Sequence, residues 1–96
     1  MRPRSANEWR SFWHQGGEDE LRVELQRIWP ALHGVADEAC ARSVERVATL
    51  LGSNAPARAL ASELGRIRAD ELDAAPDPDA DRDAADAIVA WFHAHA

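Results

Sequence analysis

The chain of 96 residues contains no lysine, no tyrosine, a single cysteine and no long apolar run. One cysteine excludes a disulfide bond within the chain and cannot supply a cysteine-rich zinc site. Because no stretch of about 18 consecutive apolar residues is present, the sequence predicts no membrane-spanning helix. Arginines near the N-terminus precede no apolar stretch, which predicts no signal peptide and a cytoplasmic protein.

A surplus of positive charge is also absent, because 11 arginines stand against 17 acidic residues and the formal net charge is −6. Proteins that bind nucleic acids generally need a basic face for the phosphates, so we expect no nucleic-acid partner. The imbalance is local: residues 1–69 hold ten arginines and nine acids, whereas residues 70–96 hold one arginine and eight acids. The negative charge of the chain therefore lies in its last quarter.

Strand patterns are missing as well, since no alternating run of β-branched residues is bounded by turn residues. Alanine is abundant instead, with 20 copies, and alanine is the best helix former. A chain of this length forms one small domain. The sequence therefore predicts a single all-α domain, a small bundle of four to five helices spanning residues 1–96.

Apolar residues at helical spacing place these helices along the chain. The expected helices span about residues 5–15, 18–29, 37–51, 54–72 and 81–93. Residues 73–80 form an acidic linker before the last helix, because Pro76 and Pro78 interrupt regular helix there. Gly65 falls inside the fourth helix, where a close contact between helices would explain a residue that disfavours helix.

The densest charge feature is a series of aspartates that spans the linker and the last helix: Asp77, Asp79, Asp81, Asp83 and Asp86. Alternate carboxylates bind calcium in EF-hand loops, which require glycine at position six and glutamate at position twelve. Counted from Asp77, those positions hold Arg82 and Ile88, which argues against calcium. Two interpretations stay open: a solvated acidic linker at a helix N-terminus, or a docking surface for a basic partner.

Other chemical groups are sparse in this sequence. His93 and His95 are two residues apart, whereas metal-binding pairs on helices are three or four apart, so we expect no metal. Cys40 lies on an apolar stripe beside acidic neighbours, which favours core packing over a nucleophile. No glycine-rich phosphate loop or nucleophile–base pair is found, so we expect no cofactor and no enzymatic activity.

Aromatic residues gather at the two ends of the chain, around Trp9, Phe12 and Trp13 and around Trp91 and Phe92. These two groups either pack together in the core or leave one ring exposed as an anchor for a partner. Trp13 is the candidate for an exposed ring, because it lies just before the glycine pair at 16–17.

Several of these residues match the pattern of a family of uncharacterised small helical bacterial proteins. The matching positions are Leu25, Ile28, Trp29, Gly34, Val35, Asp37, Glu38, Leu50, Leu51, Ala61, Leu64 and Ile67. The stretch from Leu21 to Phe92 thus resembles this family, although residues 30–33 replace its Trp-Asp-Pro-Ile segment and Ala39 replaces a tyrosine. The resemblance implies a helical fold and an association with immunity or accessory proteins encoded beside toxins.

These observations together predict a non-catalytic module that binds a basic protein partner, such as an immunity protein that neutralises a toxin or effector. The predicted contact residues are the five aspartates and Trp13. The alternative is a self-associating structural or regulatory helical protein, in which aromatic ends or alanine-rich faces pack against a second copy.

Overall fold

The structure, a computed structural model, describes residues 16–95. Its elements follow one another as α2 (Glu18–Ile28), the 3₁₀ turn η2 (Pro30–Leu32), α3 (Asp37–Gly52), α4 (Ala57–Ile67), the π turn η3 (Arg68–Leu72) and α5 (Pro78–His95). The described residues contain four α-helices and no strand, which confirms the predicted small all-α bundle. The helix expected over residues 5–15 lies outside the described residues.

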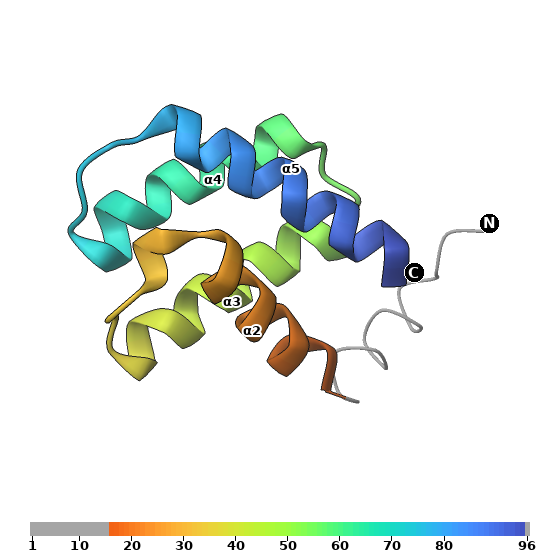
Figure 1. The fold of residues 1–96 in the computed structure, drawn as a ribbon, viewed down its shortest axis with the longest axis horizontal. Helices are drawn as coiled ribbons and strands as arrows, with labels where there is room; N and C mark the ends of the chain where they lie inside the picture. The colour runs from red at the N-terminus through yellow and green to blue at the C-terminus, as the bar shows by residue number, and fades with distance from the viewer. Residues whose placement is uncertain (1–15, 96) are drawn as a thin grey trace.

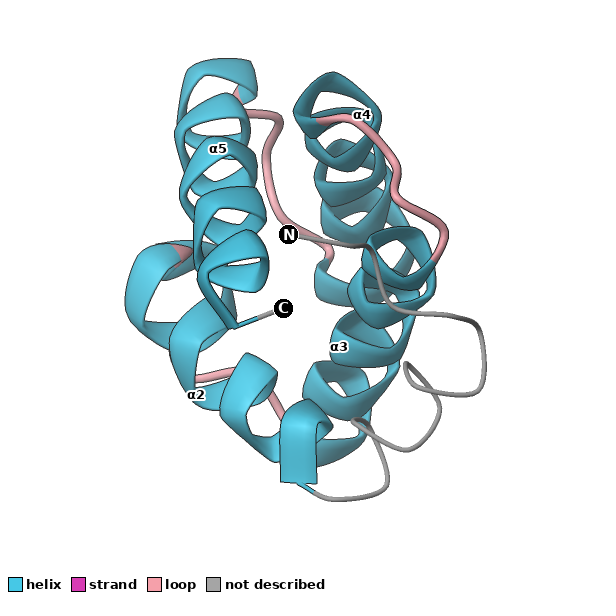
Figure 2. Cartoon of the chain, turned by 90° about the vertical axis from the view of Figure 1, so that its right-hand side faces the viewer, coloured by secondary structure: helices cyan, strands magenta, loops and turns pink. Residues whose placement is uncertain are grey.

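The four helices form a closed arrangement in which each one packs against its neighbours in the chain. The last helix, α5, returns to contact the first described helix, α2, and also packs along α4 (Figure 1). Seen from the side, α5 and α2 lie on one side of the bundle while α4 and α3 lie on the other (Figure 2). The apolar faces of all four helices therefore point into one shared core.

The core is built from the apolar stripes expected from the sequence. Its buried members are Leu21, Leu25, Trp29, Leu32, Cys40, Val44, Val47, Ala48, Leu51, Leu60, Leu64, Ile67, Ala84, Ala85, Ile88 and Phe92. Leu32 lies in η2, a segment expected to be a loop, and its 2% exposure makes it a full core residue. Ile28, Leu72 and Trp91 are half-buried and pack against this core from its edge.

The predicted helices over residues 18–29 and 37–51 end where backbone chemistry stops the helix. Helix α2 ends at Ile28 because Pro30 disfavours helical geometry in the residue before it, and Trp29 has an extended backbone. Helix α3 includes Gly52, one residue beyond the expected end, and Asn54 then adopts a left-handed backbone with φ of 59°. Asparagine tolerates that conformation better than most residues, so it suits the turn toward α4.

The fourth predicted helix is not a single α-helix. Helix α4 ends at Ile67, and η3 continues the chain as a wider π turn to Leu72. Asp73 then takes a left-handed backbone with φ of 48°, and the amide of Ala74 donates to the carbonyl of Arg68 at 2.9 Å. This wide turn begins at Arg68, so it sets the position from which that arginine enters the interior.

The last helix begins earlier than the sequence predicts. Helix α5 starts at Pro78, inside the expected linker of residues 73–80, so the irregular segment covers only residues 73–77. Proline is favoured at the first position of a helix because its missing N–H has no intrahelical partner there in any case. The Asp77 carboxylate accepts a hydrogen bond from the amide of Ala80 at 3.2 Å and caps the helix.

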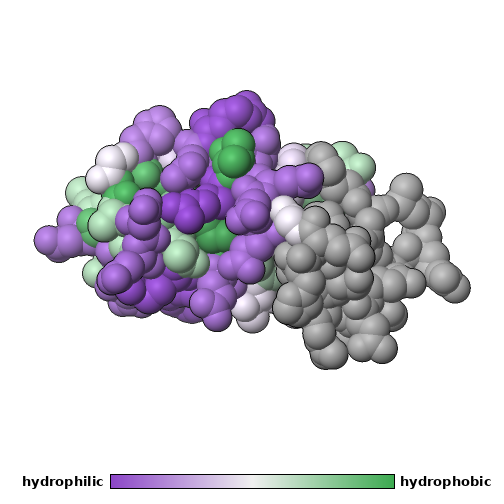
Figure 3. All heavy atoms as spheres, turned by 90° about the horizontal axis from the view of Figure 1, so that it is seen from below, coloured by the Kyte–Doolittle hydropathy of each residue, from purple (hydrophilic) through white to green (hydrophobic). Residues whose placement is uncertain are grey.

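The surface over the described residues is mostly polar. On the face seen from below, hydrophilic side chains cover most of the area and apolar ones form small separate patches (Figure 3). Val23 is the large apolar residue that stands out, with 65% of its surface exposed. Within residues 16–95, no helix combines the length and the apolar character that crossing a membrane requires.

Candidate functional site

The five predicted aspartates do not form one cluster, because their side chains do not all lie on the same face of α5. Asp77, Asp79, Asp83 and Asp86 are exposed. Asp81 differs from the expectation of a surface contact residue, since it is buried with 3% of its surface exposed. The helical period explains this difference: Asp81 continues the stripe of Ala84, Ala85 and Ile88 that faces the core.

Three of the exposed aspartates share one face of α5. Asp79, Asp83 and Asp86 are spaced by four and three residues, so their side chains lie above one another along about 10 Å of helix. We call Asp79, Asp83 and Asp86 the acidic face. Asp79 is paired at 2.6 Å with the exposed Arg82, while Asp83 and Asp86 form no ion pair with any described residue.

Asp81 is the acceptor of a buried polar trio. Its Oδ1 accepts one hydrogen bond from the indole nitrogen of Trp29 at 2.9 Å and another from Nε of Arg68 at 2.7 Å. Arg68 is itself buried, with 8% of its surface exposed, and its guanidinium carbon lies 5.4 Å from the centre of the Trp29 ring. We call Trp29, Arg68 and Asp81 the buried trio, which ties α2, η3 and α5 together.

Arg68 also secures the segment that precedes α5. Its Nη1 donates to the carbonyl oxygen of Ala75 at 3.3 Å. The same side chain therefore holds both Asp81 and the irregular segment of residues 73–77. A buried guanidinium needs such partners because an uncompensated charge in the interior is very unfavourable.

Ion pairs near the surface join α3 to α4 and η3. Arg46 on α3 lies 2.6 Å from Glu63 on α4 and 3.2 Å from Asp70 on η3, and Arg42 lies 2.5 Å from Glu71. The hydrogen bond from Arg42 to Glu71 raises the pKa of that guanidinium above its ordinary value. We call these five residues the α3–α4 network, which lies at the surface.

The pKa of the Arg46 guanidinium is also raised, although partial burial acts against this. Partial burial lowers the pKa of the Arg46 guanidinium, but its hydrogen bonds to Glu63 and Asp70 outweigh that effect and leave the pKa raised. Acidic and basic groups thus compensate one another along this seam.

Among the hollows of the described surface, two lie beside α5. One of about 290 Å³ lies between α4 and the start of α5 and is lined by Gly65, Pro76 and Pro78 among others. The other, more open hollow of about 460 Å³ lies between α2 and α5, beside Val23 and Trp91. Exposed acids, Asp19 and Glu20, line the second hollow, so negative charge borders both.

Helix α4 passes close to α5 at the first of these hollows. A Cβ placed on Gly65 would lie 3.7 Å from Oδ2 of Asp81, which is an ordinary contact distance. Gly65 therefore lies at the expected close contact between helices. The space that its missing side chain leaves belongs to the hollow in front of Asp81.

The groups considered for catalysis or metal binding are dispersed. Cys40 is buried, and its sulfur accepts a hydrogen bond from the Gln26 amide at 3.4 Å, while Nε2 of His33 lies 2.8 Å from the carbonyl oxygen of Gln26. Over residues 16–95, no three His, Cys, Asp or Glu side chains are grouped so that they could hold a metal ion. Trp13, the predicted aromatic anchor, lies outside the described residues.

Reasoning from sequence alone missed Trp29 and Arg68 as members of a polar site, although a signal was present. Arg68 follows Leu60 and Leu64 at intervals of four, so it continues the apolar stripe of α4. A charged residue on an apolar stripe needs a buried partner. Asp81 likewise continues the apolar stripe of α5 and therefore also needs a buried partner.

Comparisons of the chain with protein-family models, with curated proteins and with solved structures gave no match. The resemblance to small helical bacterial proteins therefore stays a prediction.

Proposed function

We propose that this protein is a non-catalytic module that binds a basic protein partner through the acidic face of α5. In its cell the partner would be a toxin or effector domain, and the module would act as its immunity protein or inhibitor. A basic toxin that acts on nucleic acid presents the cationic surface that such a face attracts.

The observation that carries this proposal is the contrast between paired and unpaired charge. Nearly every described arginine already has an acidic partner within the chain; Arg58 is the described exception. Asp83 and Asp86 have no basic partner among the described residues, and Asp79 has an exposed neighbour on its own helix, Arg82. Unpaired carboxylates aligned on a rigid helix provide a surface that steers a basic protein and fixes its orientation.

Other classes of function have less support. A nucleic-acid partner would meet the same carboxylates, which repel phosphates. The thiol of Cys40 is buried and contacts the Gln26 amide, whereas a nucleophile requires a base and access to substrate.

Binding to the products of neighbouring genes tests the proposal. Each neighbour is produced separately and titrated against the full chain by calorimetry, at low salt and at about 0.15 M salt, where the Debye length is about 8 Å. We expect one neighbour to bind, and we expect higher salt to weaken that binding. The triple variant D79N/D83N/D86N should weaken it further.

A matched control removes the same number of exposed charges elsewhere. The triple variant D37N/E38Q/E45Q changes three exposed acids on α3 and should leave the affinity close to that of the parent. Equal loss in both triple variants would show that only net charge matters and would contradict a role for the acidic face. Binding to no neighbour at either salt concentration would remove the partner class itself.

The alternative of self-association is tested in the same samples. Val23 is the large exposed apolar residue of the described surface, so a dimer would be expected to cover it. Light scattering that shows a dimer in the parent and a monomer in Val23→Ser would favour self-association over a basic partner.

A further inference from the structure

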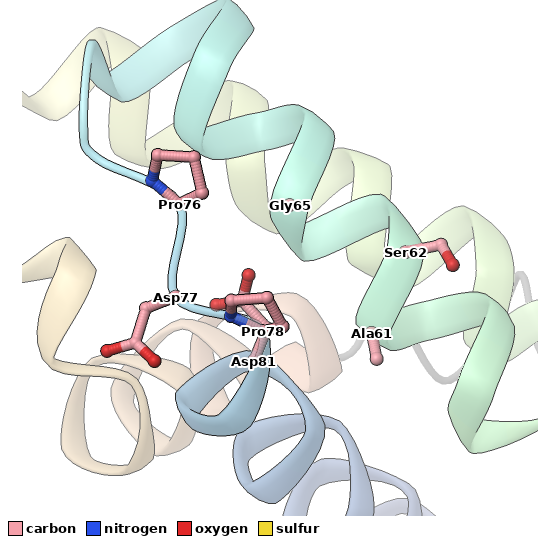
Figure 4. Close-up of a pocket in the computed structure, with 7 residues that line it drawn as sticks. All are labelled: Ala61, Ser62, Gly65, Pro76, Asp77, Pro78 and Asp81. Atoms are coloured by element: carbon pink, nitrogen blue, oxygen red, sulfur yellow. The ribbon is translucent and has the colours of Figure 1, made fainter.

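The hollow between α4 and the start of α5 has a distinct construction (Figure 4). We call it the proline cavity. Two rigid rings, Pro76 and Pro78, form one wall, and the α4 backbone at Ala61 and Gly65 forms the opposite wall. Its volume of about 290 Å³ is large enough for one long side chain.

The base of the proline cavity is a carboxylate that has an acceptor to spare. Oδ1 of Asp81 accepts both hydrogen bonds of the buried trio, from Trp29 and from Arg68. Oδ2 accepts none from any described residue and lies opposite Gly65, toward which the carboxylate is directed in Figure 4. Asp81 is 3% exposed and lines the cavity, so the cavity gives access to its carboxylate.

The side chains that line the cavity select for a hydrogen-bond donor. Proline, glycine and alanine side chains donate nothing, and the Ser62 hydroxyl donates to the carbonyl of Arg58 at 3.2 Å. Ser62 also points away from the cavity in Figure 4. An anion would therefore find no donor among these side chains and would meet the Asp81 carboxylate, with Asp77 at the rim.

Charge around the mouth favours a cation over a neutral donor. Arg68 compensates Asp81 through Oδ1 and Arg82 pairs with Asp79, so the excess negative charge at the mouth comes from the exposed Asp77. The charge of Asp77 outweighs the partial positive charge of about half a unit at the start of α5. Residues 70–96 as a whole carry eight acids and one arginine.

We infer that the proline cavity receives one lysine or arginine side chain of the basic protein partner. The aliphatic part of that side chain would lie between Pro76, Pro78 and Ala61, and its terminal N–H would donate to Oδ2 of Asp81. This inference rests on the proposed function and deepens it. The acidic face attracts and orients a basic protein, and the cavity adds a specific contact at the N-terminal end of that face.

Short blocked peptides test the chemistry without knowledge of the partner. Acetyl-Gly-Lys-Gly-amide and its arginine counterpart are titrated into the ¹⁵N-labelled full chain, with the norleucine peptide as a neutral control of similar shape. The indole N–H of Trp29 is a direct reporter because it donates to the same carboxylate, and the amide of Gly65 reports on the opposite wall. We expect saturable shifts of both signals with the lysine or arginine peptide and none with norleucine.

Filling the cavity gives a matched pair of variants. Gly65→Leu places a side chain in front of Oδ2 while favouring the helix, so the saturable shifts should disappear. Thr49→Leu makes a similar change at an exposed position of α3 and should bind like the parent. Unchanged circular dichroism and amide spectra outside the cavity confirm that Gly65→Leu is folded.

These experiments test the cation site in the cavity independently of the proposed function. Equal shifts with lysine and norleucine, or saturable shifts that persist in Gly65→Leu, would overturn the inference. If a partner protein binds with the expected dependence on the acidic face but tolerates Gly65→Leu, the cavity is refuted while the proposed function stands. If the peptides bind in the cavity but no neighbouring gene product binds, the proposed partner is refuted and the cation site stands.

Discussion

The α3–α4 side of the molecule and the α5 side differ in where their ion pairs lie. The α3–α4 side pairs its charges near the surface, whereas the α5 side has a buried ion pair beneath exposed aspartates. In the α3–α4 network, Arg42 and Arg46 pair with acids of α4 and η3 at the edge of the bundle, where the ion pairs stay partly exposed to solvent. On α5, one aspartate is buried with an arginine and a tryptophan while its neighbours on the outer face stay unpaired. In the first arrangement the arginines and acids neutralise one another. In the second, Asp83 and Asp86 have no ion-pair partner among the described residues and can meet the charge of a partner protein.

The comparison shows that position on the helix, rather than residue type, decides what an aspartate does. Asp81 and Asp83 are two residues apart, yet one is 3% exposed and the other lies on the acidic face. Exposed ion pairs contribute about 0–1 kcal/mol to stability. Removal of one partner from a buried pair costs about 3–5 kcal/mol, because a charge is left without compensation.

Asp81→Ala should give the largest effect and would test this contrast most directly. The change leaves the buried guanidinium of Arg68 and the indole N–H of Trp29 without their acceptor. We expect the free energy of unfolding to fall by about 3–5 kcal/mol, measured by urea denaturation. The control Asp83→Ala, on the exposed side of the same helix, should change it by about 0.5 kcal/mol or less.

A double variant sharpens the interpretation of that loss. Arg68→Met combined with Asp81→Leu removes both charges together, and such replacements of buried pairs are often neutral or stabilising. We therefore expect the double variant to be more stable than Asp81→Ala in the same denaturation assay. A double variant that is less stable than Asp81→Ala would show that the trio contributes through its hydrogen bonds rather than by charge compensation.

Trp29→Phe should give the next largest effect. It retains an aromatic ring near Arg68 but removes the N–H donor to Asp81, and it also removes apolar area from the core. We expect a loss of about 1–3 kcal/mol in the free energy of unfolding. A loss below this range would mean that the indole hydrogen bond adds little to the Arg68–Asp81 pair.

Arg46→Ala should have a smaller effect on the other side of the molecule. Arg46 is the centre of the α3–α4 network, and its removal should lower the free energy of unfolding by about 1 kcal/mol or less. Added salt should shrink this difference, because the groups are exposed enough to be screened. Arg58→Ala is the matched control, since Arg58 forms no ion pair with a described residue; a loss as large as that of Asp81→Ala would contradict the comparison.

Gly65→Ala should give the smallest change, and in the opposite direction. Its Cβ would meet Asp81 at an ordinary contact distance of 3.7 Å, and alanine favours helix over glycine by about 0.8–1.0 kcal/mol. We expect a gain in thermal midpoint that corresponds to no more than about 1 kcal/mol. Gly34→Ala should instead lower stability, because Gly34 has φ of 76°, where a side chain is strained.

Much of this fold follows from the sequence because apolar spacing and proline positions act locally. The stripes of Leu21 and Leu25, of Val44 and Val47 and of Leu60 and Leu64 all face the core as expected. Helix α5 starts three residues before the predicted position, because Pro78 interrupts a helix interior but suits the first position of a helix.

The buried trio could not be predicted with the same ease, because it depends on how distant segments meet. The stripe positions of Arg68 and Asp81 indicate that each is buried, but they do not say that the two meet or that Trp29 joins them. Likewise, the series of alternate aspartates suggested one acidic surface. Only the arrangement of α5 against α4 and α2 separates Asp81 from the acidic face.

The hydrogen bond between Trp29 and Asp81 joins residues that are 52 positions apart in the chain. During synthesis, the indole and the Arg68 guanidinium both emerge from the ribosome before their shared acceptor. Contacts of such long sequence separation form late, since loop closure must precede them. The indole of Trp29 and the guanidinium of Arg68 therefore wait for α5 to dock before their shared acceptor is in place, and a chain that stops short of Asp81 lacks that acceptor altogether.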